Sequence, residues 1–153
     1  MTNKSKEKER LLISACLFGE NVRYDGKNSL IAQLEQLKEK YELISVCPEV
    51  LGGMVVPRIP SEIVSTNPLK VQNEFGIDTT IFFTDGAMQT LHICKKYDIK
   101  KALLKSKSPS CGNTQVYDGN FNGTLVDGQG LTANILRRNN IQIFNENQIG
   151  ELI

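Results

Sequence analysis

The chain has 153 residues, of which 40% are hydrophobic and 23% are charged, and its formal net charge is +1. This length suits one domain with its own core, and the composition is that of a soluble globular protein. The near-neutral charge gives no reason to expect nucleic acid or a membrane surface as a partner, and no stretch approaches transmembrane length. We therefore expect a cytoplasmic monomer or small homo-oligomer, with residues 1–10 as a charged flexible leader and residues 11–153 as a single domain.

Short apolar runs alternate with amphipathic segments in the first half of the chain. Residues 11–15 have the composition of a buried strand, residues 30–41 carry an apolar stripe at helical spacing, and residues 42–46 predict a second strand. A strand, a helix and a strand with short connections form a βαβ unit, which builds parallel sheets. Residues 47–62 contain three prolines and two adjacent glycines. We expect a long irregular loop there, and long ordered loops tend to be functional.

The second half of the chain continues this alternation. Residues 79–97 begin with strand-like composition, but their apolar residues fall at helical spacing and favour one helix, with Gly86 as a tolerated weak point. The other expected elements are a short edge strand at 70–73, a third strand at 101–105, a polar loop with a small hairpin at 108–123, a helix at 131–138 and a fourth strand at 141–144. The pattern predicts an α/β fold, an open Rossmann-like parallel sheet of about four strands with helices on both faces.

Three of the four cysteines follow predicted strands. Cys16 comes directly after the first strand, Cys47 directly after the second, and Cys111 a few residues after the third. In open parallel sheets, ligands bind beyond the carboxyl ends of the strands, so one edge of the sheet should bring these three thiols together. Cys94 instead falls on the apolar face of the helix at 79–97, where cysteine behaves as a small hydrophobic residue.

Three converging thiols in a reducing compartment favour a shared metal site over three separate core residues. A closed zinc site usually needs a fourth ligand, but the chain has no CxxC pair and its single histidine, His92, lies on a predicted helix. Iron–sulfur clusters are bound by thiolates, and a four-iron cluster on three of them leaves one iron open as a Lewis acid. Arg23 is too far from Cys16 for a phosphatase loop, and no nucleotide-binding glycine motif is present.

Conspicuous motifs surround each of these three cysteines. They are SACL at 14–17 with RYDG at 23–26, VCPEVLGG at 46–53 with PR at 57–58, and SPSCG at 108–112 with YDG at 117–119. Together they resemble the thiouracil desulfidase family, and the likeness spans nearly the whole chain after the leader. Many members carry a further cysteine just before the RYDG segment, where this chain has Val22. That difference argues against a fourth thiolate.

The resemblance implies an oxygen-sensitive [4Fe-4S] cluster on Cys16, Cys47 and Cys111, with Glu49 and Ser108 as catalytic residues. The implied substrate is a small thiolated pyrimidine, thiouracil or thiouridine monophosphate, which is converted to its oxo form with release of hydrogen sulfide and no net electron transfer. The soft substrate sulfur would bind the open iron, and Glu49 would activate the attacking water. Ser108 would donate to the ring or place the water.

Four further residues are candidates for substrate binding. Arg23 and Arg58 could each hold an anionic part of the substrate, or each could belong to a structural ion pair, such as one between Arg23 and Asp25. Tyr24 could stack on a base or simply pack against the protein. Ser110 lies next to the third cysteine and completes the set.

Two other functions compete with catalysis. A cluster carrier or redox sensor would use the same three cysteines but would need no carboxylate beside the cluster, so the loops carrying Glu49 and Ser108 argue against it. A structural zinc module would be colourless and tetrahedral. The colour of the anaerobic protein separates these two alternatives, and turnover separates the enzyme from both.

Overall fold

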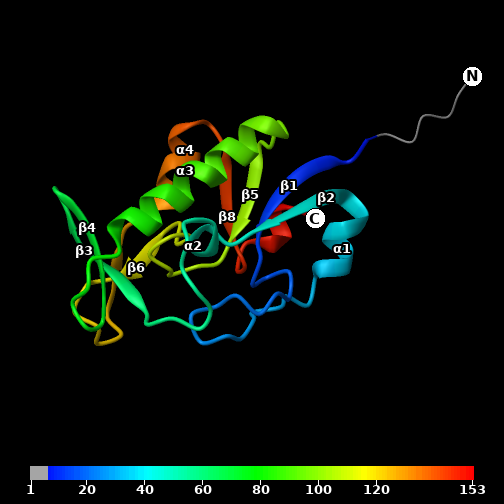
Figure 1. Ribbon diagram of the computed structural model, residues 1–153. Helices are drawn as coiled ribbons and strands as arrows, with labels where there is room; N and C mark the ends of the chain where they lie inside the picture. The colour runs from blue at the N-terminus through cyan, green and yellow to red at the C-terminus, as the bar shows by residue number, and fades with distance from the viewer. Residues whose placement is uncertain (1–6) are drawn as a thin grey trace, which may run out of the picture.

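Four parallel strands form the central sheet of the computed structural model, which describes residues 7–153 (Figure 1). The strands are β1 (Glu9–Ser14), β2 (Tyr41–Val46), β5 (Lys101–Leu104) and β8 (Gln142–Asn145). Their order across the sheet is β2-β1-β5-β8, and every neighbouring pair is parallel. The predicted α/β fold with an open parallel sheet is therefore confirmed.

The strand order reverses beside β1. The chain passes from β1 to β2 on one side and then returns across β1 to pair β5 on the other side. Ligands of open α/β sheets bind at such a switch point, in the crevice beyond the carboxyl ends of the two strands. Cys16 follows β1 and the polar segment 105–111 follows β5, so the topology alone directs both toward this crevice.

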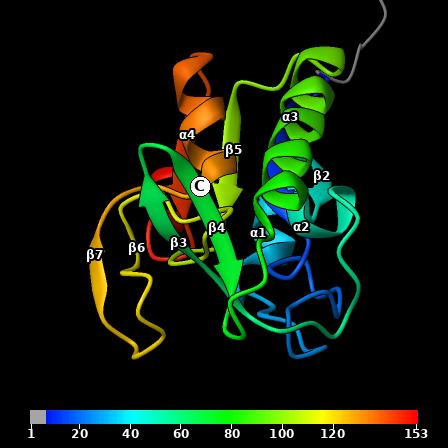
Figure 2. The same ribbon diagram turned by 60° about the vertical axis from the view of Figure 1, so that its left-hand side comes forward.

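Helices cover both faces of the sheet, as predicted. On one face, α3 (Thr80–Lys96) and α4 (Leu131–Arg138) pack side by side (Figures 1 and 2). On the other face lie α1 (Leu34–Lys40) and the 3-10 helix η1 (Ile149–Glu151). No helix within residues 7–153 is long and apolar enough to cross a membrane.

Both faces of β1 are buried, which explains its unbroken apolar run. Leu12 belongs to the core beneath α3 and α4, whereas its neighbours Leu11 and Ile13 belong to the core beneath α1. Successive side chains of a strand point to opposite faces, so a strand covered on both sides needs apolar residues at every position.

The first strand begins earlier than expected. Glu9 and Arg10 belong to β1, although the prediction placed them in the charged leader. The guanidinium of Arg10 pairs with Glu42 on β2 at 3.2 Å, and the backbone of Arg10 is in register with the same residue. The rest of the predicted leader, apart from residues 7 and 8, lies outside the described residues.

The first helix is shorter than the predicted range of 30–41. Asn28 accepts a hydrogen bond from the backbone N–H of Leu30 at 3.0 Å, and the local turn that this bond closes delays the helix until Leu34. Tyr41 already belongs to β2, and its hydroxyl donates to the carbonyl of Leu152 at 2.8 Å. Within the helix the apolar stripe marked the buried side, because Leu34 and Leu37 belong to the core beneath α1, whereas Leu30 lies before the helix and is exposed.

The region expected to be an irregular loop contains regular elements. The short helix α2 (Pro48–Leu51) starts with proline at its first position, where the missing N–H costs nothing. The strand β3 (Ser61–Thr66) pairs antiparallel with β4 (Leu69–Asn73) in a hairpin outside the main sheet. The strand expected at 70–73 thus exists, but its partner is β3.

A second hairpin, β6 (Gln115–Tyr117) with β7 (Leu125–Asp127), includes the predicted turn region.

Two glycines allow α2 and α3 to approach closely. A Cβ atom at Gly86 would collide with the carbonyl oxygen of Pro48, and one at Gly52 would collide with the carbonyl oxygen of Phe82. Gly86 is therefore required by helix packing, and the expectation of a merely tolerated weak point was wrong. Because Cys47 is the N-cap of α2, the packing of α2 against α3 also fixes the position of the helix start beside this cysteine.

Candidate active site

A cleft of about 420 Å³ lies beyond the carboxyl ends of β1, β2 and β5. Cys16, Cys47 and Cys111 all line this cleft, together with Glu49 and Ser108. These residues come from three separate segments, each of which follows a strand of the main sheet. The structure thus brings the five residues with predicted metal-binding or catalytic roles into one cavity.

Cys47 occupies the N-cap position of α2. Its Sγ lies 3.9 Å from the carbonyl oxygen of Val22, which accepts from the thiol. Burial raises the pKa of Cys47, while backbone N–H groups of Val50 and Glu49 at the start of α2 act in the opposite direction. Amide groups at a helix start stabilise a thiolate, so this position suits a sulfur ligand that must lose its proton.

The other thiols of the cleft are also strongly desolvated. Burial raises the pKa of Cys16 to about 11, and the nearby Cys47 adds to the effect. Burial raises the pKa of Cys111 to about 12, although a hydrogen bond from Ser14 opposes it. These thiols stay protonated at neutral pH unless a positive partner such as a metal compensates the thiolate charge. The fourth cysteine, Cys94, is buried in the core beneath α3 and α4 and does not line the cleft.

The donor groups around the cleft can be compared with those that metal centres require. Within residues 7–153, no three Cys, His, Asp or Glu side chains lie close enough together to hold a single metal ion. A mononuclear zinc ion would need its ligands gathered at about 2.0–2.3 Å. Iron–sulfur clusters are bound by thiolates, and three desolvated thiols around one cleft fit that donor set.

Ser108 shapes the turn that carries the third cysteine. Its Oγ accepts hydrogen bonds from the backbone N–H of Cys111 at 2.6 Å and of Ser110 at 3.2 Å. With both bonds accepted, the hydroxyl hydrogen of Ser108 is available to donate, and this side chain lines the cleft.

Ser110 has a different place from the one expected. Its side chain is buried and does not line the cleft, and its Oγ lies 2.8 Å from Oγ1 of Thr132 on α4. This hydroxyl ties the cysteine turn to α4, so its position does not support the predicted role in substrate binding.

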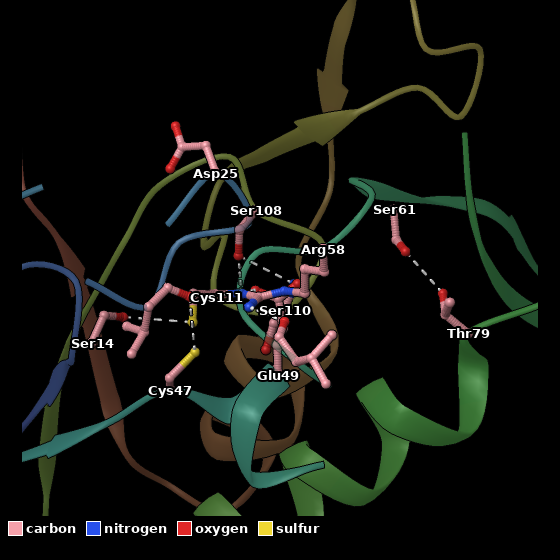
Figure 3. Close-up of polar contacts among 12 residues, drawn as sticks. Ser14, Asp25, Cys47, Glu49, Arg58, Ser61, Thr79, Ser108, Ser110 and Cys111 are labelled. Atoms are coloured by element: carbon pink, nitrogen blue, oxygen red, sulfur yellow. Dashed lines mark hydrogen bonds and ion pairs between the residues drawn. The ribbon is translucent and has the colours of Figure 1, made fainter. Parts of the chain in front are cut away.

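Arg58 forms a half-buried ion pair with Glu49 (Figure 3). The Nη2 of Arg58 lies 3.0 Å from Oε2 of Glu49, and the two side chains are only 5% and 19% exposed. Arg58 also donates to the backbone carbonyls of Val22 at 3.0 Å and Val55 at 3.2 Å. Of the two roles considered for Arg58, the structure shows the ion pair. Its partner, Glu49, could not be identified from the sequence.

Arg23 is likewise held by the protein. Its Nη2 lies 3.2 Å from Oδ2 of Asp25, and its Nη1 donates to Oγ of Ser29 at 3.1 Å. The structural pair with Asp25, one of the two alternatives raised for this arginine, is present. The neighbouring Tyr24 lines the cleft with a partly exposed ring, so it remains a candidate for contact with a planar ligand.

Sequence reasoning missed a polar network at the end of β5. Glu146 accepts from the backbone N–H and the hydroxyl of Ser106, both at 2.8 Å, and pairs with Nζ of Lys105 at 2.9 Å. Burial alone would raise the pKa of Glu146, but the hydrogen bonds from Lys105 and Ser106 outweigh it and hold the pKa below its usual range. Forty positions separate Glu146 from Ser106, and no local pattern signals such a contact.

A second missed feature is the loop after β6. The buried carboxylate of Glu62 on β3 accepts from the backbone N–H of Gly119 at 2.9 Å and of Phe121 at 3.2 Å. These bonds hold the loop beside the cleft, which both Phe121 and Tyr117 line. The turn at Gly119 was visible in the sequence, but its anchor on the β3–β4 hairpin was not.

Comparison with known proteins identifies the family. The profile of the family described as 2-thiouracil desulfurase matches residues 11–148. The chain belongs to this family. That match contains all three cysteines of the cleft together with Glu49 and Ser108, and it confirms the resemblance seen in the motifs.

Two known proteins are similar to this chain over nearly its whole length. An uncharacterised protein of Bacillus subtilis strain 168, YbbK, is 31% identical over 150 residues, which are 94% of this chain and 99% of that protein. A solved structure described as the [4Fe-4S]-dependent thiouracil desulfidase TudS is 41% identical. It covers 95% of both chains with a TM-score of 0.88.

Proposed function

We propose that this protein is a [4Fe-4S]-dependent desulfidase that hydrolyses a thiouracil to uracil and hydrogen sulfide. One observation carries the proposal: three desolvated thiols and a half-buried carboxylate line a single cleft at the switch point of the sheet. The family match and the likeness to TudS support the same conclusion. The atoms balance without a redox partner, because one water supplies the new oxygen and both hydrogens of the sulfide.

Cys16, Cys47 and Cys111 are the ligands we propose for the cluster. When bound, a four-iron cluster on three thiolates supplies an open iron, a Lewis acid that withdraws electrons from a thiocarbonyl group. The three thiols release their protons on loading, since only thiolates bind the metal.

Glu49 is the general base in this proposal. A carboxylate that lines the cleft beside the thiols can accept a proton from a water as that water attacks the thiocarbonyl carbon, and can return it to the departing sulfur. Arg58 holds the Glu49 carboxylate at 3.0 Å and is itself anchored on the carbonyls of Val22 and Val55. The Glu49 carboxylate is therefore held in one orientation, which favours proton transfer from a water placed to attack the substrate.

Ser108 is proposed to contact the substrate ring. Its Oγ already accepts two backbone N–H bonds, so the remaining interaction of this hydroxyl is donation toward an oxygen or nitrogen acceptor in the cleft. The rings of Tyr24 and Phe121 line the same cleft and offer planar surfaces to a pyrimidine.

The charges around the cleft favour a neutral base over a nucleotide. Arg58 is paired with Glu49, Arg23 with Asp25, and Lys105 with Glu146. A phosphate would have to compete with those carboxylates, whereas an uncharged thiouracil would not. Lys107 also lines the cleft, but it is exposed to solvent, where a single ion pair contributes little. We therefore propose free thiouracil as the preferred substrate.

The decisive experiment measures sulfide release from 2-thiouracil, 4-thiouracil and thiouridine monophosphate by the anaerobically reconstituted protein. We expect turnover of at least one free base, weaker turnover of the nucleotide, and loss of activity in Glu49→Gln. Glu74→Gln is the matched control, because Glu74 also lines the cleft but is exposed. A loaded protein that releases no sulfide from any thiocarbonyl would instead support the cluster carrier or sensor.

We also propose a cytoplasmic location. A cluster held by thiolates is favoured in a reducing compartment, which supports this location. The oligomeric state, a monomer or a small homo-oligomer, stays a prediction.

A further inference from the structure

Ser14 connects the end of β5 to the most buried thiol of the cleft. It is the last residue of β1, and its Oγ accepts a hydrogen bond from the backbone N–H of Lys105 at 2.9 Å. The same Oγ lies 3.5 Å from Sγ of Cys111, to which it donates (Figure 3). A hydroxyl has a single hydrogen, so the bond accepted from Lys105 leaves that hydrogen for the sulfur.

The position of this hydroxyl is fixed by the sheet. Ser14 is only 3% exposed and is in register with Val46 of β2, while Lys105 directly follows β5 on the other side. Both flanking strands are parallel to β1, and the side chains of β1 are buried on both faces of the sheet. The donor therefore cannot turn away to water, and the orientation toward Cys111 is built into the switch point of the fold.

Two thiols of the cleft, those of Cys47 and Cys111, have different hydrogen-bonding environments. Cys47 lies beside backbone N–H groups of α2, and its thiol faces the carbonyl of Val22. Cys111 is the most buried of the three, and Ser14 is the side-chain donor that reaches its sulfur. A hydrogen bond to a ligating sulfur withdraws negative charge from it and sets both the reduction potential and the retention of a cluster.

We propose that Ser14 is a positioning residue that holds Cys111 as a cluster ligand, raises the reduction potential of the cluster and slows its loss of iron. This inference rests on the proposed function, because it assumes a cluster on the three thiols. It assigns to Ser14 a role in the cofactor site that is separate from substrate binding and from proton transfer.

The test compares reconstituted variants that differ in the hydroxyl at this position. Ser14→Ala removes it, and Ser14→Thr and Ser14→Val form a matched pair of nearly equal shape of which only the threonine retains a donor. Ser110→Ala is the control, because Ser110 is an equally buried serine next to Cys111 whose hydroxyl contacts Thr132 instead of sulfur. The midpoint potential is measured by anaerobic dithionite titration, and iron loss by transfer to a coloured chelator.

We expect Ser14→Ala and Ser14→Val to shift the midpoint potential to more negative values and to lose iron about 10-fold faster than the wild type. Ser14→Thr and Ser110→Ala should stay close to the wild type in both measurements. Equal potentials and equal iron loss in the threonine and valine variants would overturn the inference, even if Ser14→Ala failed to fold. The same shift in Ser110→Ala would also overturn it, since general loosening of the turn would then be the cause.

The outcomes also separate this inference from the function on which it rests. A wild-type protein that binds no four-iron cluster would overturn the proposed function and this inference together. A wild type that binds the cluster and releases sulfide, with a Ser14→Val variant of unchanged potential and iron retention, would overturn the role of Ser14 alone.

Discussion

Glu49 and Arg58 form a half-buried ion pair whose Oε2 and Nη2 atoms lie 3.0 Å apart. The pair joins the first turn of α2 to the loop that leads into β3, and it places a fixed carboxylate next to three thiols. The guanidinium is almost fully enclosed, and its Nε has no hydrogen-bond partner among the described residues. Because the guanidinium holds the carboxylate that we propose as the general base, we expect catalysis to depend on Arg58.

Replacement of Arg58 should impair turnover more than substrate binding. We expect Arg58→Met to lower kcat about 10-fold or more with a much smaller change in KM, because Glu49 loses the partner that orients it. Loss of the Arg58 hydrogen bonds to a half-buried carboxylate and to two backbone carbonyls should also lower the free energy of unfolding, by about 2 kcal/mol. Steady-state kinetics and urea denaturation measure the two effects.

Arg23→Met is the matched control for that change. Arg23 pairs with Asp25, but both side chains are partly exposed, so its loss should cost about 1 kcal/mol or less. Arg58→Lys should recover part of the lost kcat, because a cation is restored without the planar fork. An Arg58→Met enzyme with unchanged kcat would show that the pair does not orient the base.

The glycine at the contact of α2 and α3 should tolerate no larger residue. Gly86→Ala directs a methyl group at the carbonyl oxygen of Pro48, and we expect it to lower the free energy of unfolding by about 2 kcal/mol. Because α2 begins directly after Cys47, the variant should also retain less iron after reconstitution. Gly150→Ala is the control, since its added methyl group would meet open space. Equal denaturation midpoints for the two variants would contradict this account of the helix contact.

Glu146 should make the stability of the protein depend on pH in the acidic range. Hydrogen bonds from Lys105 and Ser106 hold its pKa below the ordinary value despite burial. The carboxylate of Glu146 therefore binds a proton more tightly in the unfolded chain than in the folded one. Its contribution to the free energy of unfolding is complete above the ordinary carboxyl pKa and is lost as the pH falls through the lowered pKa.

Thermal melting of Glu146→Gln across this pH range measures that contribution. We expect the variant to melt below the wild type at pH 7 and the difference to shrink steadily as the pH falls toward the lowered pKa. Ser106→Ala removes the hydroxyl donor but leaves the backbone donor, so its deficit should be smaller. A difference in melting temperature that is constant with pH would show that Glu146 acts through packing alone.

The fold and the gathering of the thiols could be predicted because both depend on local patterns. Cys47 follows β2 directly and Cys16 lies two residues after the end of β1, and parallel strands place their carboxyl ends at one edge of the sheet. The helix containing Cys94 was visible from its apolar periodicity, which also explains why this thiol is in the core.

The features that could not be predicted depend on how distant loops meet. Arg58 reaches Glu49 only because the proline-rich loop turns back over α2, and Glu146 reaches Ser106 across forty positions. Ser110 looked like a site residue because it adjoins Cys111, but its side chain points to Thr132 on α4. Gly86 looked like a defect in a helix because its neighbour, α2, was not expected to be a helix.

The most direct test of the central claim measures iron content and sulfide release together for single alanine variants of the four cysteines. The proteins are reconstituted anaerobically and assayed with free thiouracil. We predict about four irons and full turnover for the wild type and for Cys94→Ala, whose sulfur is buried in the core away from the cleft. Cys16→Ala, Cys47→Ala and Cys111→Ala should lose both the cluster and sulfide release. A Cys111→Ala protein that keeps its four irons and its turnover, or a Cys94→Ala protein that loses them, would contradict the account.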